Sequence, residues 1–216
     1  MSRLVFMGIQ GSGKGTQADR MQQRYGLTHI TVGELFRTHM QQGTEIGELA
    51  RHYVENGLLV PDDTVLLVVE AALEEAGDCY VLDGFPRNQA QAEHLLDDIP
   101  IEKAVLFVFS DEKARERITA RRVCSQCGAN YHLELHPPKM DGVCDRCGGE
   151  VVPRKDDNPE AVAKRMKDFH TQTDDAIRLF DERHMLVRVD ADQPIEKVHE
   201  DVVRALREAG LKLKQK

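Results

Sequence analysis

A glycine-rich segment near the amino terminus restricts the folds that are open to this chain. Residues 8–16 read Gly-Ile-Gln-Gly-Ser-Gly-Lys-Gly-Thr, which fits the phosphate-binding pattern Gly-x-x-x-x-Gly-Lys. An apolar run at residues 3–7 precedes it, and residues 16–24 are predicted to form a helix. In such a loop the glycines let backbone N–H groups face phosphate oxygens, and the helix amino terminus adds partial positive charge. The segment therefore predicts a phosphate site at the start of an α/β fold.

One position differs from the general pattern. Lys14 supplies a mobile charge that can follow a phosphoryl group in transfer. Gly15 follows it, where the general pattern has serine or threonine, and Thr16 comes one residue later. A hydroxyl ligand to magnesium is therefore not predicted from the loop itself.

Three more apolar runs, at residues 79–83, 104–109 and 186–190, are predicted to be strands. Strands that are apolar on both faces are typical of parallel sheets covered by helices. Apolar residues recur at helical spacing within residues 162–180 and 195–206, and we expect these stripes to pack in the core. The pattern predicts an α/β, three-layer fold of the P-loop NTPase type with a central parallel sheet.

The charge balance limits the partners. The chain has 37 acidic and 29 basic residues in 216, so its net charge is −8. General nucleic-acid binders are more often basic, so we expect no nucleic-acid partner and a local basic cluster for any anionic ligand. No apolar run approaches the roughly 20 residues that span a bilayer, and the run before Gly8 is too short for a signal-peptide core. We therefore expect no membrane association.

The sequence Asp-Gly-Phe-Pro-Arg at residues 83–87 closes the second predicted strand. Ligands of open α/β sheets bind at the carboxyl ends of strands. Asp83 is therefore predicted to lie beside the phosphate loop and to hold magnesium through water. Arg87 can bind a phosphate with two parallel hydrogen bonds. Gln91 is predicted to lie on the same helix face as Arg87, with an amide that suits a base edge.

These spaced motifs together resemble a known family. The phosphate loop followed by Asp-Gly-Phe-Pro-Arg is similar to the nucleoside monophosphate kinases, and to the adenylate kinase family most closely, from about residue 3 to residue 209. The resemblance implies reversible transfer of the terminal phosphoryl group of ATP to AMP, giving two ADP. It also implies Mg²⁺ as a cofactor and these nucleotides as the small-molecule partners.

The resemblance assigns binding residues at matching positions. Those expected to bind ATP are Gly11, Ser12, Gly13, Lys14, Gly15, Thr16, Arg117, Arg121, Asn130, Tyr131 and Gln193. Those expected to bind AMP are Val32, Arg37, Leu58, Leu59, Val60, Gly84, Phe85, Pro86, Arg87, Gln91, Arg154 and Arg165.

Two positions depart from the adenylate kinase pattern. Val32 stands where that family commonly has a threonine that contributes to adenine selection. Asn88 resembles the residue at this position in the pyrimidine monophosphate kinases, whereas Gln91 favours adenine. The resemblance therefore implies AMP as the expected acceptor, and a nucleoside monophosphate kinase with another base preference is the alternative.

Arginines flank a segment that lacks periodicity, residues 122–159. A spacing of four residues is expected to place Arg117 and Arg121 together on one helix. Phosphoryl transfer requires positioning and charge neutralisation rather than a protein nucleophile. The resemblance implies that Asp156 and Asp157 orient such arginines. The residues expected to act in catalysis are Lys14, Arg87, Arg121, Arg154 and Arg165.

Four of the five cysteines lie in the same segment, as Cys124-x₂-Cys127 and Cys144-x₂-Cys147. This spacing fits a closed, tetrahedral four-thiolate zinc site with a structural role. The segment has few apolar residues, so a metal would supply stability that a core cannot. Bacterial adenylate kinases with a long lid resemble it closely. Two disulfides, or a nucleic-acid-binding zinc ribbon on a P-loop module, are the alternatives.

The expected organisation follows from these segments. The ranges are core at 1–30, a nucleoside-monophosphate-binding insertion at 31–60, core at 61–121, a zinc-bearing lid at 122–159 and core at 160–216. We expect a cytoplasmic protein, and the resemblance favours a monomer.

Overall fold

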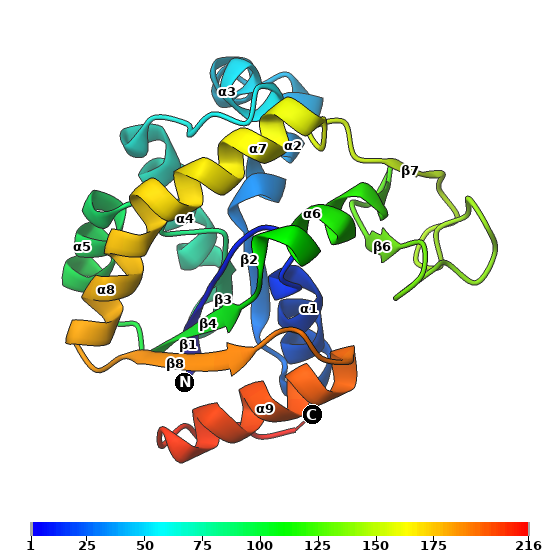
Figure 1. Ribbon diagram of the computed structural model, residues 1–216. Helices are drawn as coiled ribbons and strands as arrows, with labels where there is room; N and C mark the ends of the chain where they lie inside the picture. The colour runs from blue at the N-terminus through cyan, green and yellow to red at the C-terminus, as the bar shows by residue number, and fades with distance from the viewer. Residues whose placement is uncertain (1, 216) are drawn as a thin grey trace.

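The computed structural model describes residues 2–215 and is built around a parallel sheet (Figure 1). The strands are β1 (Ser2–Met7), β2 (Thr28–Thr31), β3 (Cys79–Asp83), β4 (Lys103–Val108) and β8 (Leu186–Asp190). Their order across the sheet is β2-β3-β1-β4-β8, and each neighbouring pair is parallel. The predicted α/β fold with a central parallel sheet is confirmed.

Strand β2 was not among the predicted strands. Its sequence, Thr-His-Ile-Thr, has one apolar residue, and only Ile30 is fully buried. The strand pairs with β3 in a register that sets Thr31 beside Asp83. Its pairing with β3, rather than its own hydrophobicity, therefore makes it a strand.

The two faces of the sheet pack against different helices. In β1, Leu4 and Phe6 pack with α1 (Lys14–Tyr25) and α9 (Ile195–Glu208). Val5 and Met7 pack on the other face, with α2 (Val32–Gln42), α4 (Asp62–Ala76), α5 (Gln89–Asp98) and α8 (Asp174–Glu182). Successive strand residues point to opposite faces, so the continuous apolar runs serve both cores. This explains why the predicted strands showed no alternation of polar and apolar residues.

Helices cover both faces and the upper edge of the sheet in Figure 1. Their bounds are α1 (Lys14–Tyr25), α2 (Val32–Gln42), α3 (Glu45–Glu55), α4 (Asp62–Ala76), α5 (Gln89–Asp98), α6 (Asp111–Thr119), α7 (Pro159–Asp168), α8 (Asp174–Glu182) and α9 (Ile195–Glu208). A π-helical turn at Phe169–Thr173 joins α7 to α8, so the predicted stripe at 162–180 is one nearly continuous helical rod (Figure 1).

A small antiparallel sheet projects from the rest of the molecule. It consists of β5 (Arg121–Cys124), β6 (Asn130–His132) and β7 (Val151–Pro153), in the order β6-β5-β7. Its buried residues are few and include two of the cysteines, Cys124 and Cys144. The projection has little apolar core of its own.

Two local predictions were wrong. Helix α6 ends at Thr119, and Arg121 begins strand β5, so Arg117 and Arg121 do not share a helix. Helix α5 begins at Gln89 after the capping residue Asn88, so Arg87 precedes the helix that carries Gln91. In both places a helix boundary falls inside the assumed four-residue spacing, and boundaries depend on capping and tertiary contacts more than on periodicity.

Among residues 2–215, none of the helices combines the length and the apolar character that a membrane crossing requires.

Candidate functional site

The phosphate loop joins β1 to α1 in a conformation that glycine permits. Gly13 caps α1 with φ of 93°, a left-handed conformation that other residues adopt at a cost. The first N–H groups of a helix have no partner within it. The Ser12 hydroxyl is also buried, with no hydrogen-bond partner among the described residues. The loop thus presents several free donors to an anion.

Lys14 lies at the first position of α1, and its ammonium folds back over the loop. The Nζ donates to the carbonyl oxygens of Gly8, at 2.7 Å, and Ile9, at 3.0 Å. Burial lowers the pKa of Lys14 to about 8, although the nearby Asp83 carboxylate acts in the opposite direction. The ammonium is therefore held against the loop, and no carboxylate within residues 2–215 forms an ion pair with it.

The unusual glycine after the lysine has a structural reason. A Cβ added at Gly15 would lie 3.2 Å from Asp83 Oδ2, a tight contact with a carboxylate. The missing side chain therefore leaves room for Asp83, which arrives from the carboxyl end of β3 and is 7% exposed. Asp83 therefore lies directly beside Gly15, the position at which the general motif has serine or threonine.

His29 of β2 supports Asp83 from the side. Its Nε2 lies 2.7 Å from the Thr31 hydroxyl oxygen and 3.5 Å from Asp83 Oδ2, and its Nδ1 lies 2.9 Å from Asp19 Oδ1. Burial lowers the pKa of His29, but the hydrogen bonds to the two carboxylates outweigh burial and raise it to about 9. Burial likewise raises the pKa of Asp83, and the hydrogen bond from His29 with the charges of Lys14 and Arg87 brings it below its usual value.

A large cavity of about 660 Å³ opens beside the phosphate loop, a volume within the usual range for small-molecule sites. It is bounded by the loop, the end of β3, the small sheet and the turn before α9. All the residues expected to bind ATP line it, namely Gly11, Ser12, Gly13, Lys14, Gly15, Thr16, Arg117, Arg121, Asn130, Tyr131 and Gln193.

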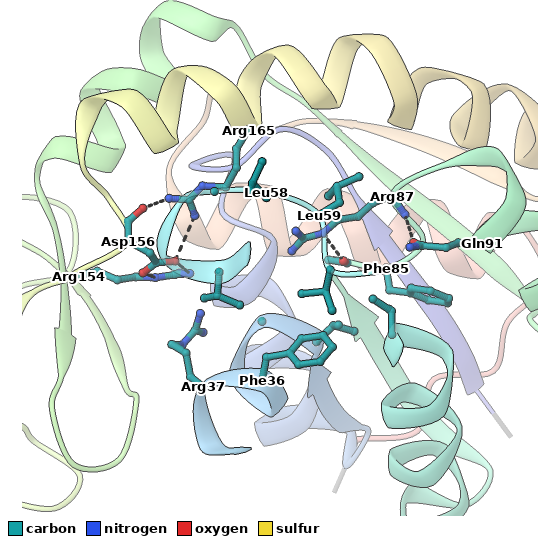
Figure 2. Close-up of a pocket in the computed structure, with 17 residues that line it drawn as sticks. Phe36, Arg37, Leu58, Leu59, Phe85, Arg87, Gln91, Arg154, Asp156 and Arg165 are labelled. Carbon is teal, nitrogen blue, oxygen red and sulfur yellow. Dashed lines mark hydrogen bonds and ion pairs between the residues drawn. The ribbon is translucent and has the colours of Figure 1, made fainter. Parts of the chain in front are cut away.

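A second, narrow cavity of about 60 Å³ lies between α2, α3 and the end of β3. Figure 2 shows Phe36 and Phe85 toward one end and Arg37, Arg154 and Arg165 toward the other, with Arg87 beside Gln91. Eleven of the twelve residues expected to bind AMP line it, whereas Pro86 lines the large cavity instead. Its composition suits a ligand with a flat apolar part and an anionic end.

The two cavities share a wall of arginines. Arg37, Arg87, Arg154 and Arg165 line both of them. They come from α2, the loop after β3, the loop after β7 and α7 respectively. Asn158 caps α7 by accepting from the N–H of Ala161, and Pro159 occupies the first position of the helix. Four separate elements therefore bring positive charge to one place.

Two acidic residues, Asp156 and Asp157, bind three arginines of the site. Arg121 binds Asp157 with two hydrogen bonds, of 2.7 and 2.5 Å, and Arg154 binds Asp156 with two of 2.6 Å. Arg165 lies 3.3 Å from Asp156 Oδ2 and 3.4 Å from Asp157 Oδ1. Such paired hydrogen bonds fix both position and orientation.

The electrostatic balance at this wall favours an anion. Burial raises the pKa of Asp156, but the hydrogen bond and charge of Arg154 outweigh it and hold that pKa well below its usual range. Burial lowers the pKa of Arg165 to about 10, and of Arg37 to about 10, so both remain charged at neutral pH. Asp156 and Asp157 offset only part of the positive charge on the clustered arginines.

The four cysteines Cys124, Cys127, Cys144 and Cys147 meet at one point of the small sheet. Their sulfur atoms all lie within 4.8 Å of one another, with separations of 3.5 and 3.6 Å in two of the pairs. Sulfurs bound to one tetrahedral zinc at about 2.3 Å lie about 3.8 Å apart, whereas a disulfide is about 2.05 Å long. The donor set fits a structural zinc ion and does not fit disulfides.

Tyr131 connects this cluster to the large cavity. Its hydroxyl donates to Cys144 Sγ at 3.3 Å and accepts from the N–H of Asp145 at 2.7 Å. The hydrogen bond from Tyr131 lowers the pKa of the Cys144 thiol. The residue was expected to contact ATP, and the structure gives its hydroxyl this second role.

Sequence reasoning missed two residues that support the site, His29 and Asp62. His29 lies on the unpredicted strand β2 and contacts Asp83. Asp62, at the start of α4, binds the side chain of Gln91. Both act across long sequence separations, and no local pattern marks either one.

The chain matches a known protein family and several curated relatives. The family model of adenylate kinase matches residues 6–185. An adenylate kinase of Thermoanaerobacter sp. (strain X514) is 42% identical, over 96% of this chain and 99% of the relative. One of Clostridioides difficile (strain 630) is 41% identical, over 94% and 98%. One of Acetivibrio thermocellus is 37% identical, over 98% and 100%.

Proposed function

This chain belongs to the adenylate kinase family of phosphotransferases, and from that premise we propose the specific reaction that it carries out. It transfers the terminal phosphoryl group of ATP to AMP, reversibly, and yields two ADP. The observation that carries the proposal is the arginine wall shared by two cavities. Two nucleotides bound on either side of it would bring their phosphates together.

The large cavity takes ATP in this proposal. The free N–H groups of the loop and the Ser12 hydroxyl bind phosphate oxygens, and Lys14 moves from its carbonyl contacts to the phosphates. Asn130, Tyr131 and Gln193 contact the base or ribose. Asp83 would hold Mg²⁺ through water, because its pKa lies below the usual value and the carboxylate therefore stays ionised beside the loop. Magnesium supplies charge neutralisation on the phosphates when bound.

The narrow cavity takes AMP, with its base among the apolar side chains and its phosphate on the arginines. Val32, Leu58, Leu59 and Val60 line the base end, with Gly84 and Phe85. A volume of about 60 Å³ is too small for a nucleotide. We therefore expect the helices of residues 31–60 to move outward when AMP binds, as a mobile nucleotide-binding insertion would.

The transfer itself requires no protein nucleophile. Arg87, Arg121, Arg154 and Arg165 neutralise charge that develops on the transferring group. Asp156 and Asp157 hold three of them before the substrates arrive, so little reorganisation is needed in the transition state. The segment 122–159 closes over the site as a lid, which excludes water that would otherwise hydrolyse ATP.

The lid is stabilised by zinc on its four thiolates in this proposal. The thiols must stay reduced for that purpose, which supports a cytoplasmic setting. A monomer is sufficient, because both cavities are formed by residues of one chain.

A coupled assay of ADP formation tests the reaction. The protein is given ATP with AMP, CMP, UMP or GMP in turn, and ATP alone is the control for hydrolysis. AMP is expected to give the highest kcat/KM, and ATP alone is expected to give almost no ADP. If CMP, UMP or GMP gave an equal or greater kcat/KM, that nucleotide and not AMP would be the acceptor. Salt-dependent binding to DNA or RNA without any phosphoryl transfer would instead favour a nucleic-acid-binding module.

A further inference from the structure

The Gln91 side chain at the narrow cavity is held on two sides. Gln91 lies in the first turn of α5 and is only 2% exposed. Its Oε1 accepts from the backbone N–H of Arg87 at 2.8 Å, as Figure 2 shows. Its Nε2 donates to Asp62 Oδ1 at 2.6 Å. The amide is therefore not free to rotate in the cavity wall.

The chemistry of these two partners fixes which end of the amide is which. A backbone N–H can only donate, so it must face the Gln91 oxygen. An ionised carboxylate can only accept, so Asp62 must face the Gln91 nitrogen. Both partners demand the same orientation. One N–H and one oxygen lone pair of the amide then remain for a ligand.

Asp62 is positioned by a further bond across the two helices. The Asn88 Nδ2 donates to both Asp62 oxygens at 3.1 Å. The Asn88 Oδ1 caps α5 by accepting from the N–H of Gln91 at 2.8 Å. The start of α4 is thus tied to the start of α5 around one amide, and Asp62 does not itself line either cavity.

We propose that Asp62 is a specificity-determining positioning residue, which sets the base preference of the narrow cavity by fixing the orientation of the Gln91 amide. This inference rests on the proposed binding of a nucleoside monophosphate there. Adenine offers a ring acceptor at N1 beside an amino donor at C6. Hypoxanthine has the same shape but offers an N–H donor beside an oxygen acceptor. A Gln91 amide in one fixed orientation can pair with only one of these two bases. The other base would then place a donor against a donor and an acceptor against an acceptor.

Asp62→Asn tests this directly, because a side-chain amide can donate or accept, so that of the two partners only the Arg87 N–H still fixes the Gln91 orientation. The measured quantity is kcat/KM for AMP and for IMP at saturating ATP. The AMP preference over IMP is expected to fall about tenfold or more, mainly through KM, while kcat with saturating AMP changes little. Asp63→Asn is the matched control, because Asp63 is exposed in the same helical turn and loses the same charge. Its AMP preference should equal that of the wild type.

The alternative outcomes separate the two proposals. An unchanged AMP preference in a folded Asp62→Asn protein would overturn the role of Asp62. A wild type that phosphorylates neither AMP nor IMP would overturn the proposed function instead. If Asp62→Asn melts below the assay temperature, Asp62→Ser takes its place, because a hydroxyl also donates or accepts and serine is well tolerated at a helix amino terminus.

Discussion

Lys14 shows how one residue can serve function at the expense of stability. Its ammonium is partly buried and donates to two loop carbonyls, those of Gly8 and Ile9. Burial lowers the pKa of Lys14 to about 8 from an ordinary value of 10.5, which means that the folded protein disfavours its charge. A nucleotide phosphate would remove that penalty. The Lys14 charge therefore contributes to ligand binding and not to the stability of the fold.

Lys14→Met should separate these two effects. Methionine keeps much of the apolar stem but carries no charge to desolvate, so the melting temperature should be equal to or above that of the wild type. Loss of a transition-state charge contact should lower kcat/KM by at least about 100-fold. Thermal melts and the coupled assay measure the two effects, and retained full activity would exclude the role of Lys14 at the phosphates.

At the scale of elements, the small sheet depends on its cysteines. Strands β5, β6 and β7 bury few apolar side chains, and the buried cluster is formed by Cys124, Ala129, Tyr131 and Cys144. A segment with so little core gains its stability from a metal when one is bound. The same segment carries Arg154 and the acidic residues that orient the arginines. Stability of the lid and arrangement of the site are therefore linked.

Cys144→Ser should release zinc from the lid. We expect a lower metal content and a lower melting temperature, because a four-thiolate site is incomplete without one ligand. Activity at low temperature should fall less than stability, since the core and phosphate loop are unaffected. Cys79→Ser is the matched control, because Cys79 lies on β3 outside the cluster. A zinc-free Cys144→Ser protein with an unchanged melting curve would contradict a structural metal.

At the scale of the whole molecule, α1 and α9 are joined by a buried polar contact. Gln17 Nε2 donates to the Ile195 carbonyl at 2.9 Å, so its Oε1 accepts from His199 Nδ1 at 3.1 Å. The His199 Nε2 is buried and has no hydrogen-bond partner among residues 2–215. Burial, and then the charges of Arg24 and Arg20, lower the pKa of His199 to about 4. The neutral ring is therefore part of the folded structure.

This contact predicts an acid-sensitive fold. The ordinary pKa of 6.5 applies to His199 in the unfolded chain, so between pH 6.5 and 4 the unfolded state binds more protons. The free energy of unfolding should therefore fall as the pH falls through this window, by about 1–3 kcal/mol from this group. Urea unfolding from pH 7 to 4 measures it.

His199→Asn provides the comparison, because its amide can still donate to Gln17 but does not titrate. The variant should lose less stability than the wild type between pH 6.5 and 4. His52→Asn, at an exposed position, should follow the wild-type curve. Parallel curves for the wild type and His199→Asn would show that His199 does not titrate in this range.

Much of this protein could be predicted from short-range patterns. The strands at 3–7, 79–83, 104–109 and 186–190 were predicted to within one residue at each end, because a strand buried on both faces must be apolar throughout. The phosphate loop and the four cysteines were found from spacing alone, because turn geometry and metal ligation restrict residue type at fixed intervals. Each of these signals lies within one short segment of the chain.

Only the tertiary structure decided the contacts that tune the site. Strand β2 exists through its pairing with β3, Arg121 belongs to a strand and not to α6, and Asp62 orients Gln91 from another helix. Gly15 is explained by Asp83, which lies 68 positions further along the sequence and meets it only in the fold. A local pattern reports what a segment buries or binds. Hydrogen bonds between distant segments depend on how the whole chain packs, because their partners become neighbours only when the sheet and helices are assembled.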